Sequence, residues 1–342
     1  MPQRQLPMIA LLATGGTIAG ISTSGGGYLP GVRPAEELLD AAPEIASLAR
    51  LRVRKIAAIG SEHMTDAIWL RLAAAVNAEL ADRSISGIVI LHGTDTMEET
   101  ACFLDLAFLP GKPVVLTGAM LPPDRPGADG PANIRSAIRV AAGARAQRRG
   151  VLVVMNGLVH RARDVIKADT AGLNAFHSPF PASIGRLAGK GPVPSWVDFP
   201  RPFRNGLRLA GISSLPRVEI VYGHAGERRD LIDAAVRAGA AGLVHAGVGA
   251  GMIHRDARPA LSEAIAAGVV VVRASRVWRG AVAESAADED RDLASGLVPA
   301  GGLNPQKARV LLQLGLIGTK KPHRIRDFFR AYTAGIGHGG AG

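Results

Sequence analysis

Short apolar runs alternate with helix-length segments over about the first 180 residues of this 342-residue chain. The strand-like runs lie at residues 8–13, 52–59, 88–91, 113–117 and 150–155, and helices are predicted at 65–81, from 96 onward and through 134 and 138. Consecutive parallel strands need a crossover connection, so this alternation is typical of a parallel sheet. We therefore predict an α/β fold with a larger N-terminal, doubly wound (Rossmann-like), mainly parallel sheet.

A second alternation follows a stretch without periodicity. Residues 189–212 are rich in Pro and Gly, and we predict an interdomain linker there. The later strands are predicted at 218–221, 242–246 and 269–273, with helices at 229–238, at 256–267 and from the Asn304-Pro305 pair to about 316. Residues 1–188 are thus expected to form a catalytic α/β domain and 213–342 a smaller α/β domain. The acidic segment 284–292 has no regular period.

Composition excludes several classes of protein. The 40 Lys and Arg residues give a formal charge of +11, but they are scattered, so we expect no specific nucleic-acid partner. One cysteine, Cys102, excludes an intrachain disulfide, and the nine histidines show no metal-binding spacing. Residues 8–13 are interpreted as a strand rather than a signal peptide, and no run has transmembrane length. We expect a cytoplasmic protein with no metal, cofactor or membrane association.

The strand at 88–91 ends in the polar sequence HGTDT. Thr94 and Asp95 therefore follow a buried strand at the edge where open α/β sheets bind ligands. Thr96 is predicted as an N-cap, with Glu99 completing a capping box. The alternative is that Thr94, Asp95 and Thr96 only cap the following helix.

The first strand ends in a similar turn, TGGTIAG at residues 14–20. The spacing does not match a dinucleotide motif, and it offers instead a second threonine, Thr17, which we expect to be exposed at a strand end. Residues 22–27 are interpreted as a mobile segment, and Tyr28 just beyond them is typical of a lid. The alternative is a solvated loop with Tyr28 packed on its base.

These residue types favour nucleophilic acyl transfer. A threonine hydroxyl such as Thr17 needs a base, and a desolvated Lys167 acting through Thr94, with Asp95 orienting it, would supply one. Lys167 lies at the tip of a predicted hairpin arm, where a surface lysine is the alternative. Backbone N–H groups of the glycine-rich turns would hold an oxyanion. A third strand end places Ser61 and Glu62 beside these groups.

Several motifs follow one another over nearly the whole chain. They are ATGGTIAG at 13–20, GSEHM at 60–64, HGTDTMEETA at 92–101, GAMLPPDRPGADGPANI at 118–134, VLVVMN at 151–156, RDVIK at 163–167, AGVGAG at 246–251, SRV at 275–277 and LNPQKARVLLQL at 303–314. In this order they resemble the bacterial-type L-asparaginases, the asparaginase/glutaminase family. The resemblance implies an amidohydrolase that converts L-asparagine to L-aspartate and ammonia through an acyl-enzyme, with L-glutamine as a second candidate substrate.

The resemblance also implies roles for individual residues. Thr17 is similar to the family's nucleophile and Tyr28 to the lid residue hydrogen-bonded to it. Thr94, with Lys167 and Asp95, resembles the second set, which activates water or relays protons. Which set attacks first stays open.

Substrate binding is implied in the same way. Ser61 resembles the residue that binds the α-carboxylate, while Asp95 and Glu62 resemble those that bind the α-ammonium. At the position of Glu62, relatives carry Gln or Glu.

Two positions in the C-terminal part of the chain concern neighbouring subunits, and at the first of them the chain departs from the family pattern. Ala250 stands where many periplasmic relatives place an Asn that supports a neighbouring subunit's site. The neighbour's acidic residue should lie in 284–292: counting back from LNPQKARV favours Glu289, and counting forward from SRV reaches Ala287. The resemblance implies a homotetramer of intimate dimers whose sites are completed across the dimer.

Two alternatives to the hydrolase are open. One is the ammonia-supplying subunit of a tRNA-charging amidotransferase, which would suit the basic charge but normally has an extra N-terminal domain. The other is a non-catalytic amino-acid sensor on the same fold, which would not need Lys167.

Overall fold

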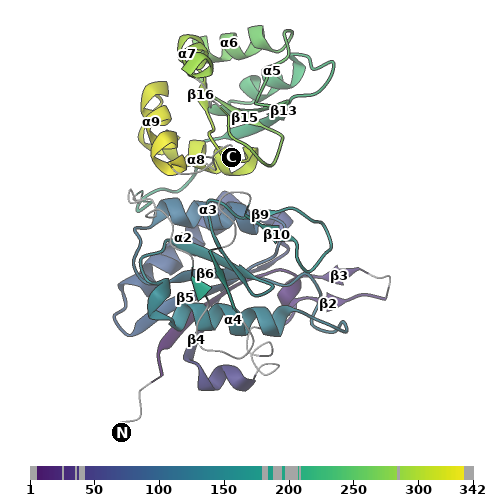
Figure 1. Ribbon diagram of the computed structural model, residues 1–342, viewed down its shortest axis with the longest axis vertical. Helices are drawn as coiled ribbons and strands as arrows, with labels where there is room; N and C mark the ends of the chain where they lie inside the picture. Colours follow the sequence, from purple (N-terminus) through teal and green to yellow (C-terminus); the bar gives the residue numbers. More distant parts are fainter. Residues whose placement is uncertain are drawn as a thin grey trace. The chain divides into compact units, whose positions relative to one another are not determined.

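The computed structural model describes residues 6–24, 27–34, 37, 43–178, 184–187, 195–196, 207, 209–282 and 286–334, without the side chains of residues 28, 195, 196 and 286–290. The chain divides into two compact units, Met1–Ser213 and Ser214–Gly342 (Figure 1). Most of the expected linker, 189–212, lies outside the described residues.

An eight-stranded sheet forms the centre of the first unit's described part, in the order β12-β11-β8-β7-β6-β5-β1-β4. The strands are β1 Met8–Gly15, β4 Arg50–Ile59, β5 Ile85–Leu91, β6 Val114–Thr117, β7 Val151–Met155, β8 Leu158–Arg161, β11 Gly185–Arg186 and β12 Ser195–Trp196. Strands β4, β1, β5, β6 and β7 run parallel, and the remaining pairs are antiparallel. The predicted mainly parallel sheet is confirmed.

Helices bury this sheet on both faces, which explains why residues 88–91 of β5 are apolar without interruption. Helices α2 (Asp66–Ala81) and α3 (Met97–Ala107) lie on one face, and α4 (Gly130–Ala142) lies on the other (Figure 1). Ile88, Val89 and Ile90 are fully buried. Strands with both faces covered are typically continuous runs of Val, Ile and Leu rather than alternating ones.

The order of strands locates the ligand crevice. From β1 the chain crosses to β4 at the sheet edge and then returns to β5 on the other side of β1. The strand order therefore reverses between β1 and β5, and in open α/β sheets ligands bind at the carboxyl ends of the strands at such a point. Thr17 and Thr94 follow these two strands.

The second unit is a smaller parallel sheet in the order β13-β14-β15-β16. Its elements are β13 Val218–Tyr222, α5 Asp230–Arg237, β14 Gly242–Gly247, α6 Arg258–Ala266, β15 Val270–Ser275, α7 Ala286–Ser295, β16 Val298–Pro299, α8 Pro305–Gly318 and α9 Pro322–Thr333. Asn304 caps α8 as predicted, since its side chain accepts the N–H of Lys307 at 3.0 Å. The smaller C-terminal α/β part of the predicted fold is confirmed.

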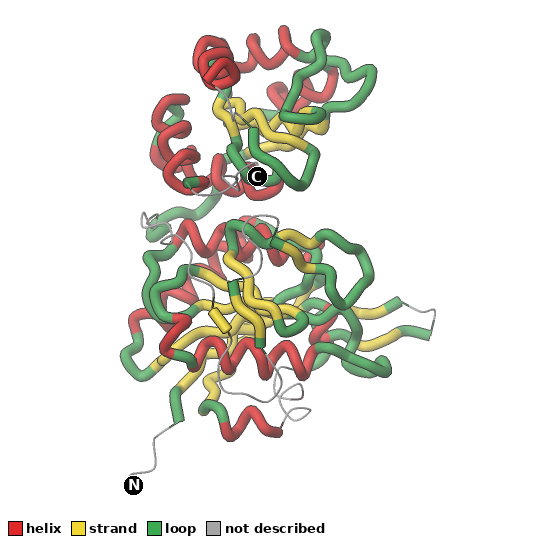
Figure 2. Tube along the Cα trace, viewed as in Figure 1, coloured by secondary structure: helices red, strands yellow, loops and turns green. Residues whose placement is uncertain are grey.

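Other elements differ from the sequence prediction or were not predicted. The acidic segment without a period belongs largely to α7, and α9 was not predicted. Two short hairpins, β2 (Ile21–Ser22) with β3 (Tyr28–Leu29) and β9 (Ile166–Lys167) with β10 (Phe176–His177), extend from the main sheet (Figure 2). Among the described residues, no helix is both long and apolar enough to cross a membrane.

Candidate active site

Three strand-end turns of the first unit meet through their backbones. A methyl group added at Gly16 would lie 2.3 Å from Gly93 Cα, and one added at Gly93 would lie 2.7 Å from Ser61 Oγ. Gly16 also has φ 84°, a conformation that glycine adopts without strain. The turns that carry Thr17, Ser61 and Thr94 are therefore in direct contact because two positions lack side chains.

Lys167 reaches Thr94 and Asp95 from the β9–β10 hairpin. Its Nζ donates to Thr94 Oγ1 at 3.0 Å and to Asp95 Oδ1 at 2.5 Å. The lysine side chain is 14% exposed and that of Asp95 is 48% exposed, while Thr94 is buried. Lys167 is thus not a free surface lysine, and the three predicted side chains form one hydrogen-bonded set.

Thr17 opens a single 3-10 turn, η1 (Thr17–Ala19). Its carbonyl accepts the N–H of Gly20 at 2.9 Å. The expectation that Thr17 is exposed was wrong: the residue is only 5% exposed, since its turn is packed against the Gly93 turn. The side chain of Tyr28, the predicted lid residue, lies outside the described part of the structure.

The predicted capping box at α3 does not form. Thr96 occupies the N-cap position, but its hydroxyl donates to the Ser61 carbonyl at 2.8 Å and makes no cap hydrogen bond. Ser61 Oγ in turn accepts the N–H of Asp95 at 3.1 Å. The threonine hydroxyl ties the turn after β4 to the turn after β5, a use that local sequence cannot reveal.

The remaining predicted substrate-binding residues, Ser61, Glu62 and Glu289, differ in their environment. Ser61 is buried at the start of η3 (Ser61–His63). The Glu62 side chain is 51% exposed and folds back over Gly60, where an added methyl group would lie 2.3 Å from Oε1. Glu289 lies on α7 of the second unit, but its side chain is outside the described part.

Two further carboxylates organise the surrounding loops. Asp129 occupies the N-cap position of α4, but its side chain makes no cap hydrogen bond and accepts the N–H groups of Met120 and Leu121, each at 3.0 Å. Asp124 accepts the N–H and the hydroxyl of Ser22 at 2.8 and 2.9 Å, which holds the pKa of its carboxyl below the usual value. These bonds connect the loop after β6 to its own helix and to the β2–β3 hairpin.

His92 is a buried neutral group next to the site. It is fully buried, and burial lowers its pKa to about 4 despite the opposing effect of the Gly93 carbonyl. Its Nδ1 lies 2.7 Å from that carbonyl oxygen, so the neutral ring carries its proton there and donates it. His92 thereby fixes the direction of the peptide that precedes Thr94.

This geometry predicts a pH dependence of stability. Between pH 6.5 and pH 4 the unfolded chain binds a proton on His92 that the folded chain does not, so the free energy of unfolding falls as the pH is lowered, by about 3 kcal/mol in all. Below pH 4 this contribution stops changing. Urea denaturation at pH 6.5 and 4.5 should show a smaller loss for His92→Asn, whose amide keeps a donor near the Nδ1 position but does not titrate. The exposed His224→Asn is the control, and equal losses in all three proteins would contradict the prediction.

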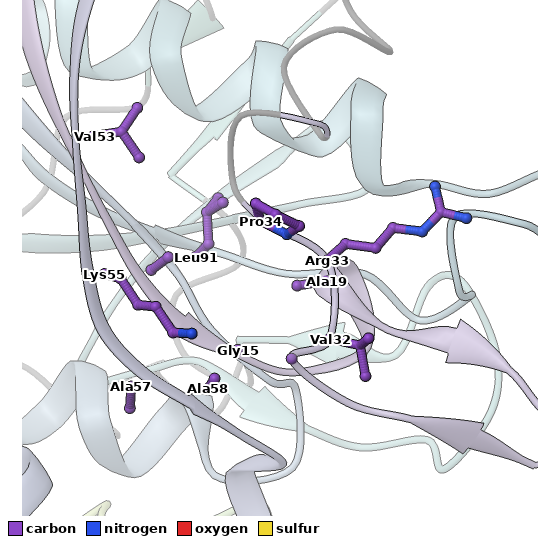
Figure 3. A pocket seen from close by; sticks show the side chains of 12 residues that line it. Gly15, Ala19, Val32, Arg33, Pro34, Val53, Lys55, Ala57, Ala58 and Leu91 are labelled. Carbon is purple, nitrogen blue, oxygen red and sulfur yellow. The ribbon is translucent and has the colours of Figure 1, made fainter.

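A separate cavity of about 130 Å³ lies beside β1 and β4. Gly15, Ala19 and Gly31 line it together with the side chains of Arg33 and Lys55 (Figure 3). None of the predicted catalytic residues lines this cavity. Among the described residues, no cluster of His, Cys, Asp and Glu could hold a metal ion.

Comparison with known proteins places these features in a family. Residues 8–195 match the model "Asparaginase, N-terminal", and residues 217–329 match the model "Glutaminase/Asparaginase C-terminal domain". The chain belongs to the asparaginase family. The resemblance noted in the sequence motifs is therefore confirmed.

Individual members of the asparaginase family are similar over nearly the whole chain. A protein named probable periplasmic L-asparaginase from Haemophilus influenzae is 43% identical, covering 96% of this chain and 93% of its own. A glutaminase-asparaginase from Acinetobacter glutaminasificans is 37% identical, covering 95% and 99%. The crystal structure of a probable cytoplasmic L-asparaginase from Campylobacter jejuni superposes with a TM-score of 0.89 at 39% identity, covering 95% of this chain and all of that one.

Proposed function

We propose that this asparaginase-family protein hydrolyses L-asparagine to L-aspartate and ammonia, with Thr17 as the nucleophile. The observation that carries the proposal is the hydrogen bonding of Lys167, on the β9–β10 hairpin, to Thr94 and Asp95, whose turn is packed against that of Thr17. Such a set suits amide hydrolysis, because a weak hydroxyl nucleophile needs a neighbouring group to take its proton.

The proposed reaction has two halves. Thr17 Oγ attacks the side-chain amide carbon, its proton passes through Thr94 and Lys167 to the leaving nitrogen, and ammonia departs from a threonine ester of aspartate. Water then attacks this ester, and Thr94 with Lys167 removes the proton of that water, so Thr17 regains its hydroxyl as L-aspartate forms. Backbone N–H groups of the glycine-rich turns stabilise the oxyanion in both halves.

We assign the orientation of the substrate to residues of two turns, the one after β4 and the one after β5. In this proposal the Ser61 hydroxyl binds the α-carboxylate, and the carboxylates of Asp95 and Glu62 bind the α-ammonium. The bond from Asp95 N–H to Ser61 Oγ supports this assignment, because it holds the two groups side by side. Charge-assisted hydrogen bonds of this kind fix both orientation and handedness of a small amino acid.

Ammonia release from L-asparagine, D-asparagine and L-glutamine, measured separately, tests the proposed activity. L-Asparagine should be the best substrate, with L-glutamine slower, since one methylene changes discrimination by only about 1 to 3 kcal/mol. Absence of ammonia release from L-asparagine and L-glutamine would refute the proposal. The amidotransferase-subunit and sensor alternatives have no support from the relatives compared above, which are named asparaginases or glutaminase-asparaginases.

We propose further that the protein assembles as a tetramer of intimate dimers, in which α7 and Glu289 complete a partner's site. Four exposed apolar side chains that follow or end the parallel strands β13, β14 and β15 support an interface at the carboxyl edge of this sheet. They are Tyr222, Met252, Val277 and Trp278, each 46–53% exposed. Exposed apolar surface of this kind is typical of interaction sites.

Trp278→Glu should therefore shift the protein to a smaller species, because a charge in a buried interface is costly. Sedimentation velocity measures the state, and activity per chain should fall about tenfold or more where the species is smaller. Leu231→Glu is a control on another exposed apolar side chain of the same unit, 62% exposed. A wild-type protein that sediments as a monomer with full activity would contradict the assembly proposal.

For the compartment, we propose the cytoplasm. One buried cysteine in 342 residues is typical of a protein that needs no disulfide. The relatives named above include both periplasmic and cytoplasmic proteins. Fractionation of the source cells tests the assignment, and activity confined to the periplasmic fraction would refute it.

A further inference from the structure

Glu98 is a buried carboxylate that the proposed reaction does not use. It lies in the first turn of α3, four residues after Thr94, and is only 6% exposed. Glutamate is seldom buried without a partner, although the positive end of a helix macrodipole favours a negative charge in the first turn. The position therefore needs a specific reason.

The partner is the main chain of Lys167. Glu98 Oε2 accepts the N–H of Lys167 at 2.7 Å, across 69 positions of sequence. The neighbouring Ala168 N–H donates instead to Ala175 of the hairpin, so the Lys167 N–H points to the outer edge of β9. Glu98 occupies that edge and joins the hairpin to α3.

Three hydrogen bonds then link Lys167 to one five-residue segment. The side chain binds Thr94 and Asp95, and the main chain binds Glu98. Two paired two-residue strands are marginal on their own, and a lysine side chain has about 2 kcal/mol of rotamer entropy. The hydrogen bond from Glu98 holds the main chain of Lys167 in place, and its Nζ atom can therefore reach fewer positions.

We propose that Glu98 is a positioning residue for Lys167: it holds the lysine main chain so that Nζ stays within reach of Thr94 Oγ1. The inference rests on the proposed function and deepens it. A small misplacement of a catalytic group costs on the order of 100-fold in rate, so the effect should be measurable.

The test compares three glutamate variants. Glu98→Gln keeps an oxygen that accepts the Lys167 N–H, whereas Glu98→Met fills similar space with no acceptor. Glu79→Met is the matched control, because Glu79 is also 6% exposed and on a helix, and its carboxylate accepts a hydrogen bond from Arg52. We expect kcat on L-asparagine to fall roughly 30- to 100-fold in Glu98→Met with KM nearly unchanged, and less than about threefold in the other two.

A double mutant separates positioning from general loss of structure. If Glu98 acts only through Lys167, Glu98→Met should cause no further loss of kcat in a protein that also carries Lys167→Met. A further loss in that background, or equal effects of Glu98→Met and Glu79→Met, would overturn the proposal.

Two readouts do not depend on turnover. The Lys167 amide should exchange with deuterium about tenfold faster or more in Glu98→Met than in Glu98→Gln. Lys167 should also be acylated faster by an amine-reactive ester in Glu98→Met. Unchanged exchange and acylation would refute the positioning role, whereas an inactive wild-type enzyme with these changes present would refute only the proposed function.

Discussion

Thr17→Ala is expected to lower kcat for ammonia release from L-asparagine by more than about 10³-fold, because the acyl-enzyme cannot form without the hydroxyl. The methyl side chain of alanine fits the space of the buried threonine. The hydrogen bond of the short 3-10 turn that begins at Thr17 uses the main-chain carbonyl of that residue, which the substitution leaves in place. Fold and L-aspartate binding should therefore persist. Ammonia assays give the rate, and calorimetric titration with L-aspartate gives the binding.

Thr14→Val is the matched control for this variant. Thr14 lies three residues earlier near the end of β1, is also buried, and donates its hydroxyl to the Leu91 carbonyl at 3.0 Å. Its loss should reduce stability by about 1 kcal/mol and leave kcat nearly unchanged. Ammonia release by Thr17→Ala above a few per cent of wild type would show that another group attacks the amide.

Lys167→Met is expected to lower kcat by roughly 10³-fold, within the range that a positioned acid or base contributes. Methionine preserves most of the side-chain length but provides no Nζ for Thr94 or Asp95. Stability should change little, since Asp95 is about half exposed and remains solvated, and such exposed ion pairs contribute about 0 to 1 kcal/mol. Kinetic assays and thermal melting measure the two effects separately.

Lys112→Met provides the comparison. Its Nζ donates to the Asp82 carbonyl at 2.6 Å and to the Glu79 carbonyl at 3.5 Å, both at the C-terminal end of α2. It should lower the melting temperature without affecting kcat. The relay assignment would be untenable if Lys167→Met kept more than about a tenth of wild-type kcat, because a base in the transition state contributes at least about 10²-fold.

Strands and turns near the site could be predicted because their signals are local. The apolar run 88–91 lies in a strand buried on both faces, and the Asn304-Pro305 pair starts α8 with the expected cap. Motif order identified the family, which the comparisons confirm. The hairpin arm that carries Lys167 was also predicted, and it corresponds to β9.

Other contacts could not be predicted because each side chain bonds to a partner distant in sequence. Thr96 matches a capping box, yet its hydroxyl binds Ser61, and Asp129 binds the loop before α4 instead of capping that helix. Glu98 gave no signal beyond an ordinary acidic first turn, although it binds Lys167. A polar side chain takes whichever partner the packed fold offers, and local propensity is only a weak guide to that choice.

The α/β architecture and the strand ends that carry Thr17, Ser61 and Thr94 could be predicted from the amino-acid sequence, because apolar periodicity and glycine turns are patterns that span only a few residues. The folded structure was needed to show that glycines 16 and 93 touch, that Thr17 is buried and that Lys167 bonds to Thr94, Asp95 and Glu98. Those contacts depend on strand order and helix packing, which bring together groups up to 77 positions apart, as for glycines 16 and 93.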